Sequence, residues 1–425
     1  MVEIYINPAR GEWEQLAARA ASDEGDISAR VEQILRLVKR GGDKALRELT
    51  AEIEGREAGE FLVTEEEFAA AEKEVPQELR RAIETAAGNI RRFHEAQRTP
   101  DIDIETVPGV RCVQRAVPIR RVGLYIPGGT APLFSTVLML AVPARVAGCS
   151  EVVMCTPAGP DGRIAPAVLW AARFCGVERV FRLGGAQAIA AMAYGTESIP
   201  RVDKIFGPGN RYVTRAKQLV SATDCAVDMP AGPSEVLVLA DGGARPEFVA
   251  ADMLSQAEHG ADSQAVAVCL DSEFARAVER EIESRLVGLP RRETALRALE
   301  NSRIVVLPTR SDAIEFANLY AAEHLIVQMS EPWEVAGQIT AAGSVFIGPH
   351  SPESAGDYAS GTNHTLPTGG WARSHSGVNL DSFTRRITFQ ELSREGLAAL
   401  ESTITTMARA EGLDAHADAV KIRLQ

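Results

Sequence analysis

The sequence lacks any apolar run long enough to cross a membrane, which takes about 20 residues in a helix. The longest apolar stretch, residues 134–147, is interrupted by Pro143 and Arg145. The N-terminus, MVEIYINPARGEW, has no basic region followed by an apolar one, so we expect no signal peptide. These absences predict a protein without a membrane partner.

Paired cysteines are also missing. The six cysteines are scattered and none forms a C-x-x-C pair, so a thiolate zinc site has no support. Isolated cysteines of this kind are typical of reduced, partly buried thiols in a cytosolic protein. We therefore expect a cytoplasmic location.

Positive charge is scarce relative to negative charge. The chain has 45 Lys and Arg against 58 Asp and Glu, a formal net charge of −13. An acidic protein repels phosphate backbones, which argues against nucleic acid as a partner. A small anionic cofactor is not excluded, because it binds through local backbone dipoles.

The 425 residues exceed the roughly 250–300 at which a single hydrophobic core stops growing, so we expect two main domains and a smaller element. Residues 1–100 are charged and mostly helical in pattern, whereas strand, turn and helix alternate from about residue 120. The best candidate for a hinge is Pro230-Ala231-Gly232-Pro233. We predict strands at residues 122–126, 151–156, 179–183, 204–206, 236–240, 265–270, 304–307, 325–329 and 344–347. We predict helices at residues 136–147, 164–175, 186–193, 211–220, 246–259, 273–285, 312–322, 392–410 and 415–424.

This alternation predicts an α/β fold with two Rossmann-like domains, parallel-rich sheets and small helical elements at both ends of the chain. No strand carries a full G-x-G-x-x-G fingerprint, since GPGNRY at 207–212 ends in tyrosine. Turns at 127–129, 184–185 and 207–209 nevertheless follow strands and precede helices. Their backbone N–H groups could cradle a pyrophosphate, or they could simply be tight turns.

Seven histidines are present, and four of them lie in short polar clusters. Gln256 and His259 stand three residues apart, so they share one helix face and could ligate a divalent metal. Asp357 lies in a run of turn-forming residues and offers a hard carboxylate, while His416 would have to reach the site from the tail. Such an N/O set suits Zn²⁺, with Mn²⁺ or Co²⁺ chemically possible. Histidines with only structural or surface roles are the alternative.

Two further clusters suggest proton transfer and substrate contact. Glu323 and His324 are adjacent proton carriers at a helix-to-strand junction, which suits acid–base chemistry. His364 follows Asp357 in the same loop and could contact a substrate. A surface dipeptide and an ordinary loop are the simpler interpretations.

Taken together, these motifs resemble the histidinol dehydrogenase family. The resemblance covers nearly the whole chain beyond about residue 85. The matching stretches are VGLYIPGGT (122–130), GGAQAIAA (184–191), DKIFGPGN (203–210), DMPAGPSEV (228–236), LSQAEHG (254–260), EHL (323–325), residues 356–368 and residues 411–423. Departures are small: Ala322 stands where the family often has proline, and Arg385 where lysine is usual.

The resemblance implies oxidation of L-histidinol through L-histidinaldehyde to L-histidine with two NAD⁺, the last steps of histidine biosynthesis. It implies a homodimer with exchanged tails and one zinc ion per subunit. By resemblance, the zinc ligands are Gln256, His259, Asp357 and His416, which also contact substrate. Glu323 then activates water, and His324 accepts protons in the hydride-transfer steps and contacts substrate. Further substrate contacts are Ser234, His364 and Glu411, and the NAD contacts are Tyr125, Gln187 and Asn210.

The expected domain organisation follows. Residues 1–25 form a helical N-terminal element. Residues 26–117 and 235–380 form the α/β domain with the metal and catalytic residues. Residues 118–234 form a Rossmann-like domain with the NAD contacts, and residues 381–425 a helical tail.

Other functions remain open. The nearest is a related zinc- and NAD-dependent dehydrogenase that oxidises another small polar alcohol to its acid. A zinc hydrolase is disfavoured by the lack of H-E-x-x-H and by the glycine turns. A non-catalytic metal-binding protein would leave Glu323 and His324 without a role.

Overall fold

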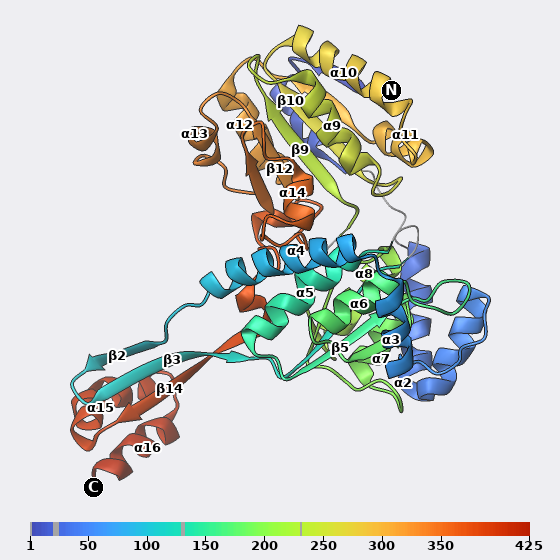
Figure 1. Ribbon diagram of the computed structural model, residues 1–425. Helices are drawn as coiled ribbons and strands as arrows, with labels where there is room; N and C mark the ends of the chain where they lie inside the picture. Colours follow the sequence, from blue (N-terminus) through green and yellow to red (C-terminus); the bar gives the residue numbers. More distant parts are fainter. Residues whose placement is uncertain (1, 20–24, 129–131, 230–231) are drawn as a thin grey trace.

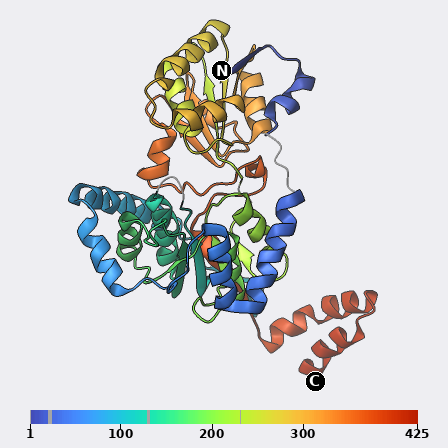
Figure 2. The ribbon, with the colours of Figure 1, turned by 90° about the vertical axis from the view of Figure 1, so that its right-hand side faces the viewer.

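Two parallel sheets form the body of the protein. The computed structural model describes residues 2–19, 25–128, 132–229 and 232–425, and Figures 1 and 2 show two globular parts and a projecting arm. The six-stranded sheet is parallel throughout and has the spatial order β1 (Glu3–Ile6), β11 (Arg303–Val306), β10 (Gln264–Cys269), β9 (Glu235–Ala240), β12 (His324–Gln328) and β13 (Ser344–Ile347).

The second sheet has five parallel strands. Its order is β6 (Arg179–Arg182), β5 (Glu151–Thr156), β4 (Arg121–Tyr125), β7 (Lys204–Phe206) and β8 (Ala226–Val227). The central strands of both sheets are apolar runs rather than alternating patterns; β9 (EVLVLA) is buried at every position. Such runs are expected where helices cover both faces of a parallel sheet.

Helices cover each sheet. Those of the six-stranded part are α1 (Trp13–Ala17), α9 (Pro246–Ala257), α10 (Ser272–Leu286), α11 (Arg292–Glu300), α12 (Arg310–Tyr320), α13 (Pro332–Ala336) and α14 (Glu353–Tyr358). Those of the five-stranded part are α2 (Gly25–Glu54), α3 (Glu65–Glu74), α4 (Gln77–Ala96), α5 (Phe134–Ala147), α6 (Pro166–Phe174), α7 (Gly185–Tyr194) and α8 (Arg211–Ser221).

A three-stranded antiparallel sheet forms the base of the arm. It consists of β14 (Thr384–Leu392), β3 (Val110–Pro118) and β2 (Ile102–Val107), and it leads to α15 (Arg394–Ala410) and α16 (Asp414–Leu424). Figure 1 shows the arm extending away from both globular parts to the C-terminus. The first strand of the tail, β14, therefore pairs with β3 of its own chain.

The α/β fold with parallel-rich sheets is confirmed, but three details differ from the sequence-based expectation. The N-terminal segment begins with a strand, β1, which joins the six-stranded sheet. The tail begins with the nine-residue strand β14. Helices α2, α3 and α4 pack on the five-stranded sheet, in clusters that include Val31 and Ile90, and not with residues 235–380 as we assigned them. Amphipathic helices show that one face is buried, not which sheet buries it.

Some expected features lie partly outside the described residues: the N-terminal element at 1 and 20–24, the turn at 127–129 and the hinge at 230–233. In the part of the chain that is described, no helix combines the length and apolarity needed to cross a membrane.

Candidate functional site

The candidate chemical groups gather at the amino edge of the six-stranded sheet. Ser234 directly precedes β9, and Glu323 directly precedes β12, which begins at His324. These strands are parallel neighbours, with His324 opposite Val236, so their amino ends lie side by side. Helix α9 runs back along the sheet and brings Gln256 and His259 to the same edge.

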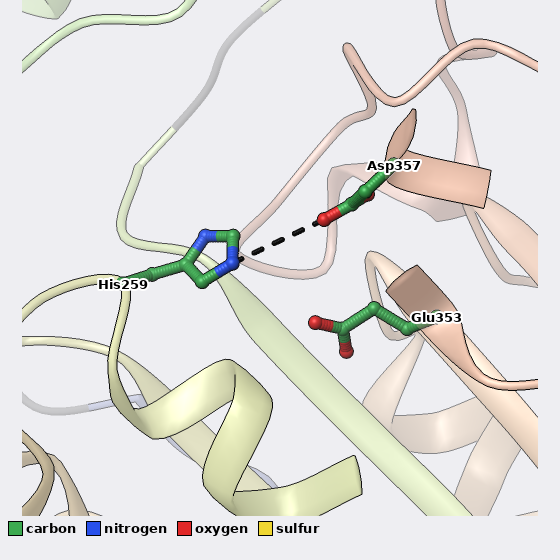
Figure 3. A group of neighbouring side chains, drawn as sticks. All are labelled: His259, Glu353 and Asp357. Carbon is green, nitrogen blue, oxygen red and sulfur yellow. Dashed lines mark ion pairs between the residues drawn. The ribbon is translucent and has the colours of Figure 1, made fainter. Parts of the chain in front are cut away.

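Three side chains form a possible metal cluster there. His259, Glu353 and Asp357 each offer a ligand atom, and these atoms lie within 4.8 Å of one another. His259 Nε2 lies 3.9 Å from Asp357 Oδ2, and Figure 3 shows the Glu353 carboxylate pointing toward the same space. The sequence analysis missed Glu353. It stands four residues before Asp357, on the same face of α14, and that spacing was the available signal.

The buried polar atoms around this cluster fit a bound cation. Gln256 is fully buried, and neither its Oε1 nor its Nε2 has a hydrogen-bond partner among the described residues. Glu353 Oε1 accepts a hydrogen bond from Ser255 Oγ at 3.1 Å, whereas its Oε2 is buried without one. Unsatisfied buried polar groups cost about 1–3 kcal/mol each, so a ligand that pairs them is favoured. Imidazole, amide and carboxylate donors suit zinc.

Glu323 and His324 form a buried acid–base pair beside the cluster. Glu323 Oε2 accepts a hydrogen bond from the backbone N–H of Glu235 at 2.9 Å and lies 3.7 Å from His324 Nδ1. His324 Nε2 lies 3.4 Å from Asp357 Oδ1. One imidazole thus stands between the candidate base and a candidate metal ligand.

Burial and charge shift the pKa values of this pair. Burial raises the pKa of Glu323 to about 8. Burial alone lowers the pKa of His324, but the carboxylates of Glu323 and Asp357 outweigh burial and raise it. For Asp357 burial acts to raise the pKa, but the neighbouring His324 outweighs it and the pKa is lowered. Perturbed groups that share a buried site are typical of catalysis.

His364 links the two globular parts. Its Nδ1 lies 2.9 Å from the backbone oxygen of Asp357, and its Nε2 lies 3.4 Å from Thr136 Oγ1 in the first turn of α5. Burial lowers the pKa of this imidazole. His364 therefore stands where the loop after α14 meets the five-stranded part.

The candidate nucleotide contacts lie at the carboxyl edge of the five-stranded sheet. Tyr125 ends β4, and its hydroxyl accepts a hydrogen bond from the backbone N–H of Gly185 at 3.1 Å. Gln187 is buried in the first turn of α7. Asn210 caps α8, where its Oδ1 accepts hydrogen bonds from the backbone N–H groups of Tyr212 and Val213 at 3.0 and 3.1 Å. The chain order reverses between β4 and β7, where open α/β sheets bind ligands.

Two expected site residues lie elsewhere in this chain. His416 is exposed on α16, and Glu411 is exposed at the end of α15. Figures 1 and 2 show both helices at the far end of the arm, away from α9 and α14. The arm therefore does not bring these side chains to the cluster of its own chain.

Comparisons with known proteins agree along the whole length of the chain. The sequence model of one family, described as histidinol dehydrogenase, matches residues 17–424. A histidinol dehydrogenase of Bacteroides fragilis (strain YCH46) is 54% identical over 424 residues, covering 100% of this chain and 99% of that protein. One from Escherichia coli (strain K12) is 54% identical over 413 residues, covering 96% and 94%. The crystal structure of histidinol dehydrogenase from Elizabethkingia anophelis superposes with a TM-score of 0.97 at 48% identity, covering 100% of this chain and 98% of that one.

Proposed function

The chain belongs to the histidinol dehydrogenase family, and on this premise we propose that it oxidises L-histidinol to L-histidine by way of L-histidinaldehyde. Two NAD⁺ would be consumed per substrate, in the last steps of histidine biosynthesis. The observation that carries the proposal is the buried pair Glu323 and His324 beside the cluster of His259 and Asp357. A four-electron oxidation needs a proton acceptor and a water activator in one place, and this pair offers both.

Gln256, His259 and Asp357 would hold one zinc ion per subunit, together with His416. The unpaired buried atoms of Gln256 and the N/O donor set support this assignment. Bound zinc would hold the substrate through its imidazole and amine. Keeping the aldehyde in the site between the two oxidations prevents its loss. Ser234, His364 and Glu411 would add substrate contacts.

His324 would accept the hydroxyl proton as a hydride leaves the alcohol carbon for NAD⁺. Glu323 would then accept a proton from water as the water oxygen adds to the aldehyde carbon. His324 would return its proton to the aldehyde oxygen as the water adds, which gives the neutral hydrate. It would then accept a hydroxyl proton of the hydrate as the hydrate transfers its hydride to the second NAD⁺, and the protons held by Glu323 and His324 would leave to solvent. Part of the negative charge that raises the pKa of His324 would be offset once Asp357 binds a cation.

Tyr125, Gln187 and Asn210 would contact NAD⁺. The helix starts of α7 and α8 beside them support this role, because the positive end of a helix dipole attracts phosphate. A cytoplasmic location is supported by the six free cysteines, since disulfides are rare in reducing compartments.

We propose further that the protein is a homodimer in which each arm completes the partner's site. The exposed positions of Glu411 and His416 on the projecting arm support this arrangement. His416→Asn should then lower the zinc content, measured by metal analysis, and an unchanged zinc content would remove His416 from the ligand set.

Mixed dimers test the exchange itself. When His416→Asn and Glu323→Gln chains are co-expressed, one site in each mixed dimer has every wild-type residue if the arms are exchanged. Aldehyde oxidation should then reappear, although neither homodimer carries it out at an appreciable rate. If the arms are not exchanged, every site carries one defect and aldehyde oxidation stays slow.

The reaction is tested by counting NADH formed per L-histidinol consumed, and two are expected. Glu323→Gln should slow aldehyde oxidation by about 10²–10⁴-fold, the usual contribution of a general base, while sparing alcohol oxidation. An equal loss of rate in alcohol oxidation and aldehyde oxidation would refute the role of Glu323 as the water-activating base. Turnover of another small polar alcohol but not of L-histidinol would instead select the related dehydrogenase.

A further inference from the structure

Arg19 forms a dense set of contacts outside the groups assigned above. It follows α1, and its Nε and Nη2 donate to the two carboxylate oxygens of Glu235, each at 2.7 Å. Its Nη2 also donates to the backbone oxygen of Tyr320 at 2.8 Å. Its guanidinium carbon lies 3.8 Å from the centre of the Tyr320 ring. Glu235 and Tyr320 are both buried, so these are not contacts of a mobile surface arginine.

Both partners of Arg19 lie directly beside the candidate base. The backbone N–H of Glu235 is the donor that holds Glu323 Oε2, at 2.9 Å. Tyr320 ends α12, three residues before Glu323. The Arg19 guanidinium therefore contacts both the Glu235 segment and the Tyr320 segment, and these two segments determine where the Glu323 carboxylate lies.

The segment between Tyr320 and Glu323 needs such support. Ala321 has a φ of 54°, in the left-handed region that residues other than glycine rarely occupy. Conformations of this kind persist only where surrounding contacts fix them. A cation at the carboxyl end of α12 also interacts favourably with the helix dipole. At Tyr320, Arg19 supplies both a contact that fixes the backbone and a positive charge at the end of α12.

We propose that Arg19 is a positioning residue that fixes the Glu323 carboxylate for water activation. The proposal rests on the proposed function of Glu323 as the water-activating base. Arginine suits this task because its planar guanidinium donates hydrogen bonds to both carboxylate oxygens of Glu235 and also to the Tyr320 carbonyl. The point charge of a lysine cannot reproduce that geometry.

The test compares two half-reactions in the zinc-loaded protein. Oxidation of L-histidinaldehyde by NAD⁺ needs activated water, whereas its reduction by NADH, the reverse of the first step, does not. Arg19→Lys should slow the oxidation by about ten- to a hundredfold, as expected for a displacement of about 1 Å. The reduction, the KM for aldehyde and the zinc content should stay within about twofold. Equal slowing of both half-reactions would overturn the proposal.

Arg303→Lys is the matched control. Arg303 donates to the backbone oxygens of Gln15 and Ala18 at 3.4 Å, so it anchors the same segment without an observed contact to Glu235 or the Tyr320 carbonyl. Both half-reactions of this variant should match the wild type. Selective slowing of aldehyde oxidation in Arg303→Lys would overturn the specific role of Arg19.

A double variant separates positioning from folding. Arg19→Gln with Glu235→Gln removes both charges of the ion pair, so the buried Glu235 carboxylate is not left unpaired and thermal stability should recover relative to Arg19→Gln alone. Aldehyde oxidation should stay slow, because an amide cannot replace the guanidinium. Recovery of aldehyde oxidation together with stability would overturn the proposal.

Glu323→Gln distinguishes a failure of the base function of Glu323 from a failure of the positioning role of Arg19. If Glu323→Gln leaves aldehyde oxidation intact, the proposed function of Glu323 fails. If Glu323→Gln abolishes it but Arg19→Lys does not slow it, only the positioning role fails.

Discussion

Asp252 should destabilise the protein at neutral pH, and its replacement by asparagine should stabilise it. Asp252 lies on α9 and is 7% exposed, and its Oδ2 accepts a hydrogen bond from Gln328 Nε2 at 2.7 Å. Burial raises the pKa of this carboxyl to about 7. Gln328 Oε1 is buried without a partner among the described residues. The amide of Asp252→Asn keeps the observed hydrogen bond and offers a donor to that oxygen.

The pKa shift of Asp252 sets the upper limit of the free energy of unfolding that Asp252→Asn can gain. A rise from 3.8 to about 7 is roughly three units, and each unit corresponds to about 1.4 kcal/mol, so the ionised carboxylate costs at most about 4 kcal/mol. The folded chain keeps a proton that the unfolded chain releases above pH 3.8. The contribution of Asp252 to stability therefore falls as the pH rises from about 4 to about 7, and its cost is fully present above pH 7.

Differential scanning calorimetry of wild type and Asp252→Asn at several pH values measures this effect. Unfolding entropy of about 2.1 cal/mol/K per residue converts 4 kcal/mol into a rise in Tm of about 4 °C for the whole chain. The rise should be small near pH 4–5 and largest above pH 7. Asp262→Asn, at an exposed position nearby, is the control and should change little at any pH. An increase in Tm that is equal at pH 5 and pH 8, or a decrease in Tm at pH 8, would refute the destabilising role of the Asp252 carboxylate.

Three further outcomes are expected. Gly207→Ala should raise the KM for NAD⁺ at least about tenfold in steady-state kinetics. Gly207 has a φ of 124°, and an added Cβ would collide with the Tyr125 carbonyl, so strain of about 1–3 kcal/mol must be relieved by moving the turn. Gln256→Ala should weaken zinc binding at least about tenfold in competition with a chelator, because it removes a buried amide oxygen from the cluster, whereas the exposed Gln338→Ala should not. Lys217→Met should lower the free energy of unfolding in denaturant by about 3–5 kcal/mol, because it leaves the Asp228 carboxylate buried without its ion pair. Adding Asp228→Asn should restore part of that loss.

Several strands of the two parallel sheets could be predicted from sequence because their apolar runs end at glycine or proline. Residues 151–156, 204–206 and 344–347 were predicted as strands and are strands with the same limits. The arm strands gave no such signal. Every residue of β14 is exposed or only half-buried, and most of its residues are polar, so no apolar run marks it.

The site could be predicted only where neighbours in sequence are neighbours in space. Gln256 lies in the last turn of α9, and His259 follows in the adjoining turn, where its backbone N–H donates to the Gln256 carbonyl at 3.2 Å. Glu323 and His324 are adjacent. Glu353 was missed because α14 is six residues long and lies within a run of turn-forming residues. Arg19 and Glu235 are 216 positions apart, and nothing in either local pattern indicates their pairing.

The two sheets present opposite edges to the candidate site, and this arrangement has an electrostatic consequence. In a parallel α/β sheet each helix runs against its strands, so helices end at the amino edge and begin at the carboxyl edge. Helices α9 and α12 end beside Gln256 and Glu323, where helix dipoles favour positive charge. Helices α7 and α8 begin beside Gln187 and Asn210, where they favour negative charge.

That polarity matches the proposed reactants. Zinc and the substrate's amine are cationic, and the pyrophosphate of NAD⁺ is anionic, so each would meet helix ends of the complementary sign. His364, between Asp357 and Thr136, stands where the two halves touch. A fold that placed both halves of the reaction at carboxyl edges would set the metal against helix starts, which repel it. Joining an amino edge to a carboxyl edge therefore provides one site for a cationic centre and an anionic cofactor.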